Sequence, residues 1–178
     1  MKIIKPFLLA ATVSFTLFSV QAKAQNTKLS DAEVASVAVV ANQIDINYAA
    51  IAKTKSKNAD ILQFAQTMTN DHKAVIAQAS ALVKKLGITP KSNSVSKSLL
   101  SGAEKTKKTL RSKTGNAFNK AYIDNEVTYH KAVIDAVEKL LIPETENSEL
   151  KELLQNIVPA LKAHLAHAEM VQKNFIGK

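Results

Sequence analysis

Apolar side chains recur at alternating steps of three and four residues in four long segments of this 178-residue chain. An α-helix turns once every 3.6 residues, so this spacing gathers the apolar side chains into one stripe, as in a helix bundle. The segments span roughly residues 30–57, 58–86, 115–141 and 147–175. Four glycines and four prolines in the whole chain favour long helices over sheet. We therefore predict an all-α, up-down-up-down four-helix bundle.

The expected helix ends have recognisable signals. Ser30 with Glu33 forms a capping box before the first segment. Gly87 is expected to stop the second helix and Pro143 the third. Pro159 lies inside the fourth segment and cannot donate a backbone hydrogen bond, so a kink is expected there.

The 28 residues or so between the second and third segments are too long for a plain loop. Leu99, Ala103, Thr106 and Leu110 follow a helical spacing, which predicts an extra short helix. Its other face is basic and carries Lys105, Lys107, Lys108, Arg111 and Lys113. A solvated face is the favoured interpretation, and contact with lipid headgroups or another polyanion is the alternative.

Residues 1–24 have the composition of a cleaved signal peptide. Lys2 and Lys5 precede an apolar run of 14 residues from Phe7 to Val20, and Ala22 and Ala24 supply a small-x-small cleavage site. A membrane span needs about 20 apolar residues. We therefore expect cleavage before Gln25, a single domain over residues 25–178, and no transmembrane segment in the mature chain.

The expected location is the periplasm or the cell exterior, with association with the outer membrane as a further possibility. The chain has no cysteine, so its stability depends on its core. Removing the three lysines of residues 1–24 from the 24 basic residues leaves 21 against 15 acidic ones. This modest positive charge permits weak association with an anionic envelope surface. No nucleic-acid partner is expected, and the sequence does not identify a partner protein.

Polar residues interrupt the apolar stripes near the midpoints of the four segments. These residues are Asp45, His72, His130 and His164. Midpoints of similar-length helices share one level in a bundle, so the four side chains are expected to form one polar layer. Three further candidates lie within one turn of them: Glu126, Asp71 and His167.

Two interpretations of the layer remain open. A single transition-metal ion such as Zn, Fe, Cu or Mn suits imidazole ligands with one or two carboxylates. A metal-free network, in which each imidazole donates to a carboxylate or a carbonyl, would instead fix the register of the helices. Both satisfy buried polar groups that are costly to leave unpaired.

Short motifs on all four segments resemble one known family. They are Asn42-Gln43-Ile44-Asp45 with Ala49, Phe64-Ala65 leading to Met68 and Asp71-His72, Phe118 with Ala121-Tyr122-Ile123 leading to His130, and Val158-Pro159 leading to His164-Leu165 and Ala168. Together they resemble the domain of unknown function 4142 family of exported bacterial proteins, often labelled outer membrane proteins. The resemblance implies export and a ferritin-like helical bundle.

A ferritin-like bundle with a di-iron site carries two Glu-x-x-His units. Here Thr69 stands three residues before His72, and Leu161 three before His164. Ferroxidase or di-iron oxygenase activity is therefore not expected. The leading hypothesis is a non-enzymatic binding or structural module, and the alternatives are a metal-dependent redox enzyme and a binder of envelope polyanions.

Overall fold

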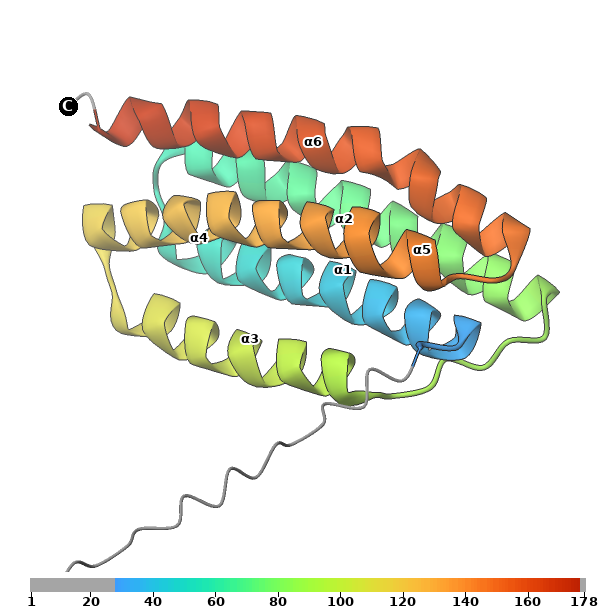
Figure 1. Cartoon of the computed structure of the whole chain (residues 1–178). Helices are drawn as coiled ribbons and strands as arrows, with labels where there is room; N and C mark the ends of the chain where they lie inside the picture. The colour runs from blue at the N-terminus through green and yellow to red at the C-terminus, as the bar shows by residue number, and fades with distance from the viewer. Residues whose placement is uncertain (1–27, 177–178) are drawn as a thin grey trace, which may run out of the picture.

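The computed structural model describes residues 28–176, and the expected signal peptide and its cleavage site lie outside them. Five long helices pack side by side (Figure 1). The elements are α1 (Asp31–Lys55), α2 (Ala59–Lys85), α3 (Ser94–Ser112), α4 (Gly115–Ala136), the π-helical turn η1 (Val137–Leu141), α5 (Ile142–Glu144) and α6 (Ser148–Ile176). The prediction of an all-α four-helix bundle with an additional helix is confirmed.

The structure confirms two of the predicted helix ends, the start of α1 and the end of α2. The capping box of Ser30 and Glu33 begins α1. Gly87, at a φ of 67°, ends α2 in the left-handed region that glycine adopts readily. Its N–H donates to the Lys84 carbonyl and that of Ile88 to the Val83 carbonyl, which together form a Schellman motif.

The sequence predicts that Pro143 ends the helix that begins at Gly115, but the helix continues past Pro143. A π-helical turn, in which the Ile142 N–H donates to the Val137 carbonyl, carries the chain on into α5 as far as Glu144. Pro143 lacks the N–H that would continue this ladder of hydrogen bonds, and the helix ends one residue later at Glu144. Pro159 lies inside α6 without ending it, and the ribbon of α6 bends in its first half (Figure 1).

The additional helix α3 is longer than the short helix expected from its apolar spacing. Asn93 and Ser96 form a capping box that starts α3 at Ser94, before the first residue of that spacing. The 19 residues of α3 run along the bundle against α1 (Figure 1). Ala103 and Leu110 are buried in this contact.

Successive long helices alternate in direction when α3 is counted (Figure 1). Because α3 brings the chain back along the bundle, α4 begins at the same end as α2. The Ser56 hydroxyl, between α1 and α2, accordingly donates to Asn119 near the start of α4. At the other end, Lys85 of α2 pairs with Glu149 of α6. The four helices other than α3 therefore run up, down, down and up, which is the order of a bundle with one long crossover. The predicted up-down-up-down order is wrong for these four helices, because α3 spans the bundle between α2 and α4.

Two apolar clusters form the core, and each receives side chains from α1, α4 and α6. One includes Ile44, Phe64, Tyr122 and Val171, and the other includes Val34, Ile134, Leu154 and Leu161. Along α2, α4 and α6, the polar residue near the midpoint falls between the two sets of apolar positions, and on α1 Asp45 directly follows Ile44, the first buried α1 residue of one cluster. The bundle is therefore apolar at both ends and polar at its middle level.

Among the helices of residues 28–176, only α1 is long and apolar enough by composition to cross a membrane. More than half of that apolar window is buried against the other helices. A core helix of a soluble bundle can have the same length and composition, so these properties do not distinguish a core helix from a membrane span. The absence of a transmembrane segment from the mature chain stays a prediction.

Candidate metal centre

Four helices each bring one side chain into a single buried layer. Asp45 comes from α1, His72 from α2, His130 from α4 and His164 from α6, and their exposed fractions are 0, 4, 1 and 7%. The centroids of the three imidazole rings lie 5.2 to 5.8 Å apart. The structure therefore brings together the four residues that the apolar spacing placed at one level.

Asp45 lies between two of the imidazoles. Its Oδ2 atom is 3.2 Å from His72 Nε2 and 3.4 Å from His130 Nε2. Charge-assisted hydrogen bonds between these groups are about 2.7–2.9 Å long. Neither Asp45 oxygen has a hydrogen-bond partner, although both are buried.

The tautomer of His72 is set by Asn42, one turn before Asp45 on α1. The Asn42 amide nitrogen donates to the Ala38 carbonyl at 2.8 Å, so Asn42 Oδ1 is the atom that faces α2. His72 Nδ1 lies 2.7 Å from this oxygen and must donate to it. With Nδ1 engaged by Asn42, His72 Nε2 faces Asp45.

The other two imidazoles are oriented in the same manner. His130 Nδ1 donates to the Glu126 carbonyl at 2.9 Å, which leaves its Nε2 as an acceptor. His164 Nε2 donates to Asp71 Oδ2 at 2.9 Å, which leaves its Nδ1 as an acceptor. Burial lowers the pKa values of His130 and His164, so both rings are neutral near pH 7.

The inward-facing nitrogens of His130 and His164 are consequently acceptors. His72 Nε2, His130 Nε2 and His164 Nδ1 are buried without a hydrogen-bond partner, as are both oxygens of Asp45. Each imidazole donates from its other ring nitrogen to a partner outside the layer. A metal-free network would need a donor for each of these atoms, and none of them receives a hydrogen bond here. The geometry therefore fits a cation at the centre better than a metal-free network.

The spacing of these atoms suits one ion. Zn–N and Zn–O bonds are about 2.0–2.2 Å long, which places two ligands of a tetrahedral ion about 3.3–3.6 Å apart. The two distances from Asp45 Oδ2, 3.2 and 3.4 Å, are close to this range. The three histidines each offer a nitrogen within 4.8 Å of the others. Outward hydrogen bonds to a carbonyl or a carboxylate are the usual second contacts of metal-bound histidine.

Glu126, a further candidate, is fully buried beside the layer. Its Oε2 lies 3.7 Å from His130 Nδ1, and it forms a second close group with Asp45 and His130. Burial, followed by the charge of Asp45, raises the pKa of Glu126 well above its usual range. Burial therefore favours the protonated, uncharged form of Glu126 in the metal-free protein.

The remaining two candidates occupy different positions. Asp71 has a half-exposed side chain and acts on the layer through its hydrogen bond from His164. His167 is not brought into the layer. Its ring packs edge-on against Phe64 at a centroid distance of 5.1 Å. His167 follows His164 by three residues, which moves it about 4.5 Å along α6 to the next apolar level.

Sequence reasoning missed Asn42 as a functional residue. It appeared in the family motif, and its position three residues before Asp45 on the same helical face was the available signal. The cavities beside the layer were also not foreseen. One of about 130 Å³ reaches Asp45, His72 and His130, and another of about 290 Å³ between α2 and α6 reaches His72 and His164.

The basic face expected on the additional helix is present on α3. Lys105, Lys108 and Arg111 are exposed. Lys107 is partly buried and pairs with Glu104 at 2.5 Å. Binding of this face to an envelope polyanion stays a prediction.

Comparisons with known proteins give one family match. No curated protein and no solved structure matches the chain. The family model described as "Domain of unknown function (DUF4142)" matches residues 18–171, which are most of the chain. The chain belongs to this family, as the motifs on α1, α2, α4 and α6 indicated.

Proposed function

We propose that the domain binds one divalent transition-metal ion through His72 Nε2, His130 Nε2, His164 Nδ1 and Asp45. The observation that carries the proposal is that three buried imidazoles offer nitrogens within 4.8 Å of one another, and each ring keeps one buried nitrogen without a hydrogen-bond partner. Leaving several buried polar atoms unpaired costs about 1–3 kcal/mol each. A bound ion removes this cost by accepting every inward lone pair.

The donor set indicates the class of metal. Neutral imidazoles with one carboxylate suit Zn, Fe, Cu or Mn, whereas Mg and Ca prefer sites made of oxygen ligands. Asp45 offsets one of the two positive charges of the ion. Asn42, the Glu126 carbonyl and Asp71 hold the three rings in the tautomers that the ion requires.

The experiment that tests the proposal measures metal binding by the mature chain, beginning at Gln25 and carrying no histidine tag. We expect one equivalent of at least one of Zn, Fe, Cu or Mn to bind. A His72→Ala, His130→Ala, His164→Ala triple variant is expected to bind none. The Asp45→Asn variant, which keeps the side-chain shape but removes the charge, is expected to bind more weakly.

His167→Ala supplies the matched control, because this histidine lies near the layer but outside it. It should bind the ion as the parent does. Circular dichroism of every variant shows whether the helices remain formed. Failure of the parent to bind any of the four metals would overturn the proposal, as would full binding by a folded triple variant.

The proposed setting of this site is the bacterial envelope. The apolar run from Phe7 to Val20 and the small residues Ala22 and Ala24 support export and cleavage before Gln25. An exported domain would acquire its ion in the periplasm or outside the cell. The domain is then a metal-binding module of the envelope.

A second candidate function, chemistry on a small molecule at the ion, is favoured by one observation. The cavity of about 130 Å³ reaches His130 and Asp45, so a molecule in it would lie beside the ion. An ion with four protein ligands can take a fifth during a reaction. Turnover by the metal-loaded protein that disappears in the triple histidine variant would support an enzyme.

A further inference from the structure

The cavity beside the layer is apolar on nearly all sides. Helices α1, α3, α4 and α6 and the turn η1 contribute to it, and its walls include Val37, Ala41, Leu99, Val133, Leu141 and Leu161. Asp45, His72 and His130 stand at one side. The volume is about 130 Å³, close to the ~150 Å³ of an apolar cavity that stays dry and takes up benzene or xenon.

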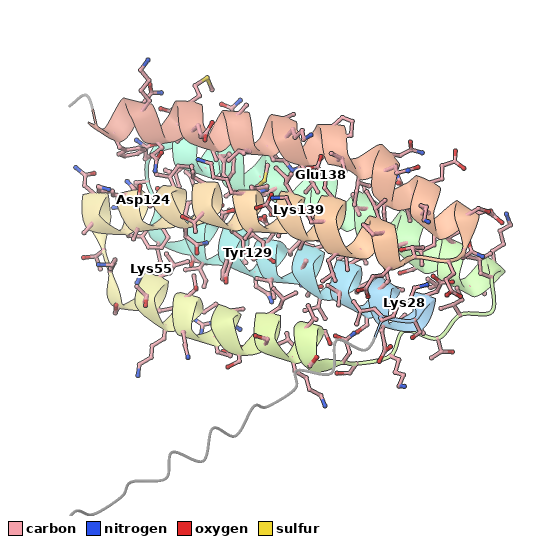
Figure 2. All side chains as sticks on the ribbon, in the orientation of Figure 1. Lys28, Lys55, Asp124, Tyr129, Glu138 and Lys139 are labelled. Carbon is pink, nitrogen blue, oxygen red and sulfur yellow. The ribbon has the colours of Figure 1, made fainter. Side chains whose placement is uncertain are left out.

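The polar side chains of the wall other than the proposed ligands already have partners. The Tyr129 hydroxyl donates to the Ala41 carbonyl at 2.9 Å, and Figure 2 shows Tyr129 on the side of α4 that faces α1. Asn42 donates to Ala38 and accepts from His72. Within residues 28–176, no lysine or arginine lines the cavity. A charged or strongly polar molecule would therefore lose its hydration without compensation from these walls.

A route from solvent leads to this cavity between α3 and α4. A neighbouring groove of about 290 Å³ shares Leu99, Tyr129 and Ala132 with the cavity. Ala132 is exposed, and Gly102 and Ala103 of α3 border the same groove. The small side chains leave space where larger ones would close the route.

We propose that a small, uncharged, apolar molecule no larger than benzene enters between α3 and α4 and lies in this cavity beside the metal ion. This inference rests on the proposed function for the presence of the metal ion beside the cavity. The cavity itself is formed by the fold in the metal-free protein, so its occupancy can be measured separately from metal binding.

Benzene is the probe, and the mature protein is used in metal-free, Zn-loaded and Mn-loaded forms. Nuclear magnetic resonance is expected to show one benzene bound per chain in each form. Because the cavity touches His130 and Asp45, Mn should strongly accelerate the relaxation of the bound benzene protons, and diamagnetic Zn should not. Filling the cavity by Ala136→Leu, or from the opposite wall by Ala38→Leu, should weaken benzene binding at least tenfold.

Ala81→Leu is the matched control, since it adds the same side chain at an exposed position of α2. It should bind benzene as the parent does, and all three variants should keep the metal stoichiometry of the parent. No benzene binding in any form would overturn the inference. Bound benzene without faster relaxation in the Mn-loaded form would place the molecule elsewhere and also overturn it. A chain that binds benzene but no Mn would contradict the proposed metal binding and leave the proposed ligand of the cavity standing.

Discussion

Asn42 Oδ1 accepts the Nδ1 proton of His72 at 2.7 Å, across the contact between α1 and α2. This bond orients the ring so that His72 Nε2 faces the interior, where Asp45 Oδ2 lies 3.2 Å away. Asn42 and Asp45 are three residues apart on the same helix. One turn of α1 thus provides both the carboxylate and the group that orients the imidazole facing it.

Replacing Asn42 by Ala should weaken metal binding while leaving the helices formed. His72 loses the acceptor that fixes its tautomer, and removal of such an outer contact lowers metal affinity by about 10–100-fold. Gln43→Ala, an exposed change on the same turn, is the control and should bind the ion as the parent does. Isothermal titration measures both affinities. Equal affinities for the two variants would show that Asn42 has no part in orienting His72.

Metal binding should stabilise the folded domain. An ion that binds the native state alone adds about 2.7 kcal/mol when its free concentration is 100 times the dissociation constant. For a domain of about 150 residues this corresponds to a rise in Tm of roughly 5–10 °C. Calorimetry with and without a chelator measures the difference. A triple histidine variant whose Tm rises equally on addition of the ion would indicate binding elsewhere.

Glu126→Gln should stabilise the metal-free protein near neutral pH. The pKa of Glu126 is raised in the folded state, so above its usual value of 4.5 the unfolded chain releases a proton that the folded chain keeps. Stability is therefore lost as pH rises above about 4.5, and the neutral glutamine removes this loss. Urea unfolding at pH 7 and pH 4 should show a gain at pH 7 that disappears at pH 4. Exposed Glu152→Gln is the control, and a gain of equal size at both pH values would contradict the account.

The histidines impose the opposite dependence on pH. The pKa values of His130 and His164 are lowered in the folded state, so below about 6.5 the unfolded chain takes up protons that the folded chain refuses. Stability is then lost as pH falls below this value. In the Glu126→Gln background, the free energy of unfolding should decrease from pH 7.5 to pH 5. A free energy that is constant over this range would mean that these imidazoles titrate normally in the fold.

Export predicts a defined N-terminus. When the full chain is expressed in a bacterium with a periplasm, mass spectrometry of the periplasmic fraction should find a protein that begins at Gln25. Ala24→Arg should prevent this cleavage, because the position before the cut requires a small residue. Recovery of the parent in the cytoplasm with Met1 still present would contradict export.

Much of this arrangement followed from sequence because helix periodicity fixes both the side and the level of a residue. The spacing placed Asp45, His72, His130 and His164 at one level without any knowledge of contacts. It could not show which atoms donate, since the tautomer of His72 depends on Asn42 in another helix. His167 was also grouped with the layer, whereas the structure places it against Phe64.

The errors in the fold have similar causes. The apolar spacing of 99–110 did not reveal that Asn93 starts α3 earlier. A helix of that length returns the chain along the bundle and makes α4 parallel to α2. Pro143 was taken as a stop, but the π-helical turn before it carries the chain on. The cavity depends on how small side chains from several helices meet, which no single segment specifies.

The most direct test of the metal site is a crystal structure of the metal-loaded mature protein with anomalous data at the absorption edge of the bound metal. The account predicts one anomalous peak about 2.0–2.2 Å from His72 Nε2, His130 Nε2, His164 Nδ1 and an Asp45 oxygen. A fully loaded crystal with its peak elsewhere, or with Asp45 and the three histidines hydrogen-bonded only to one another, would contradict it.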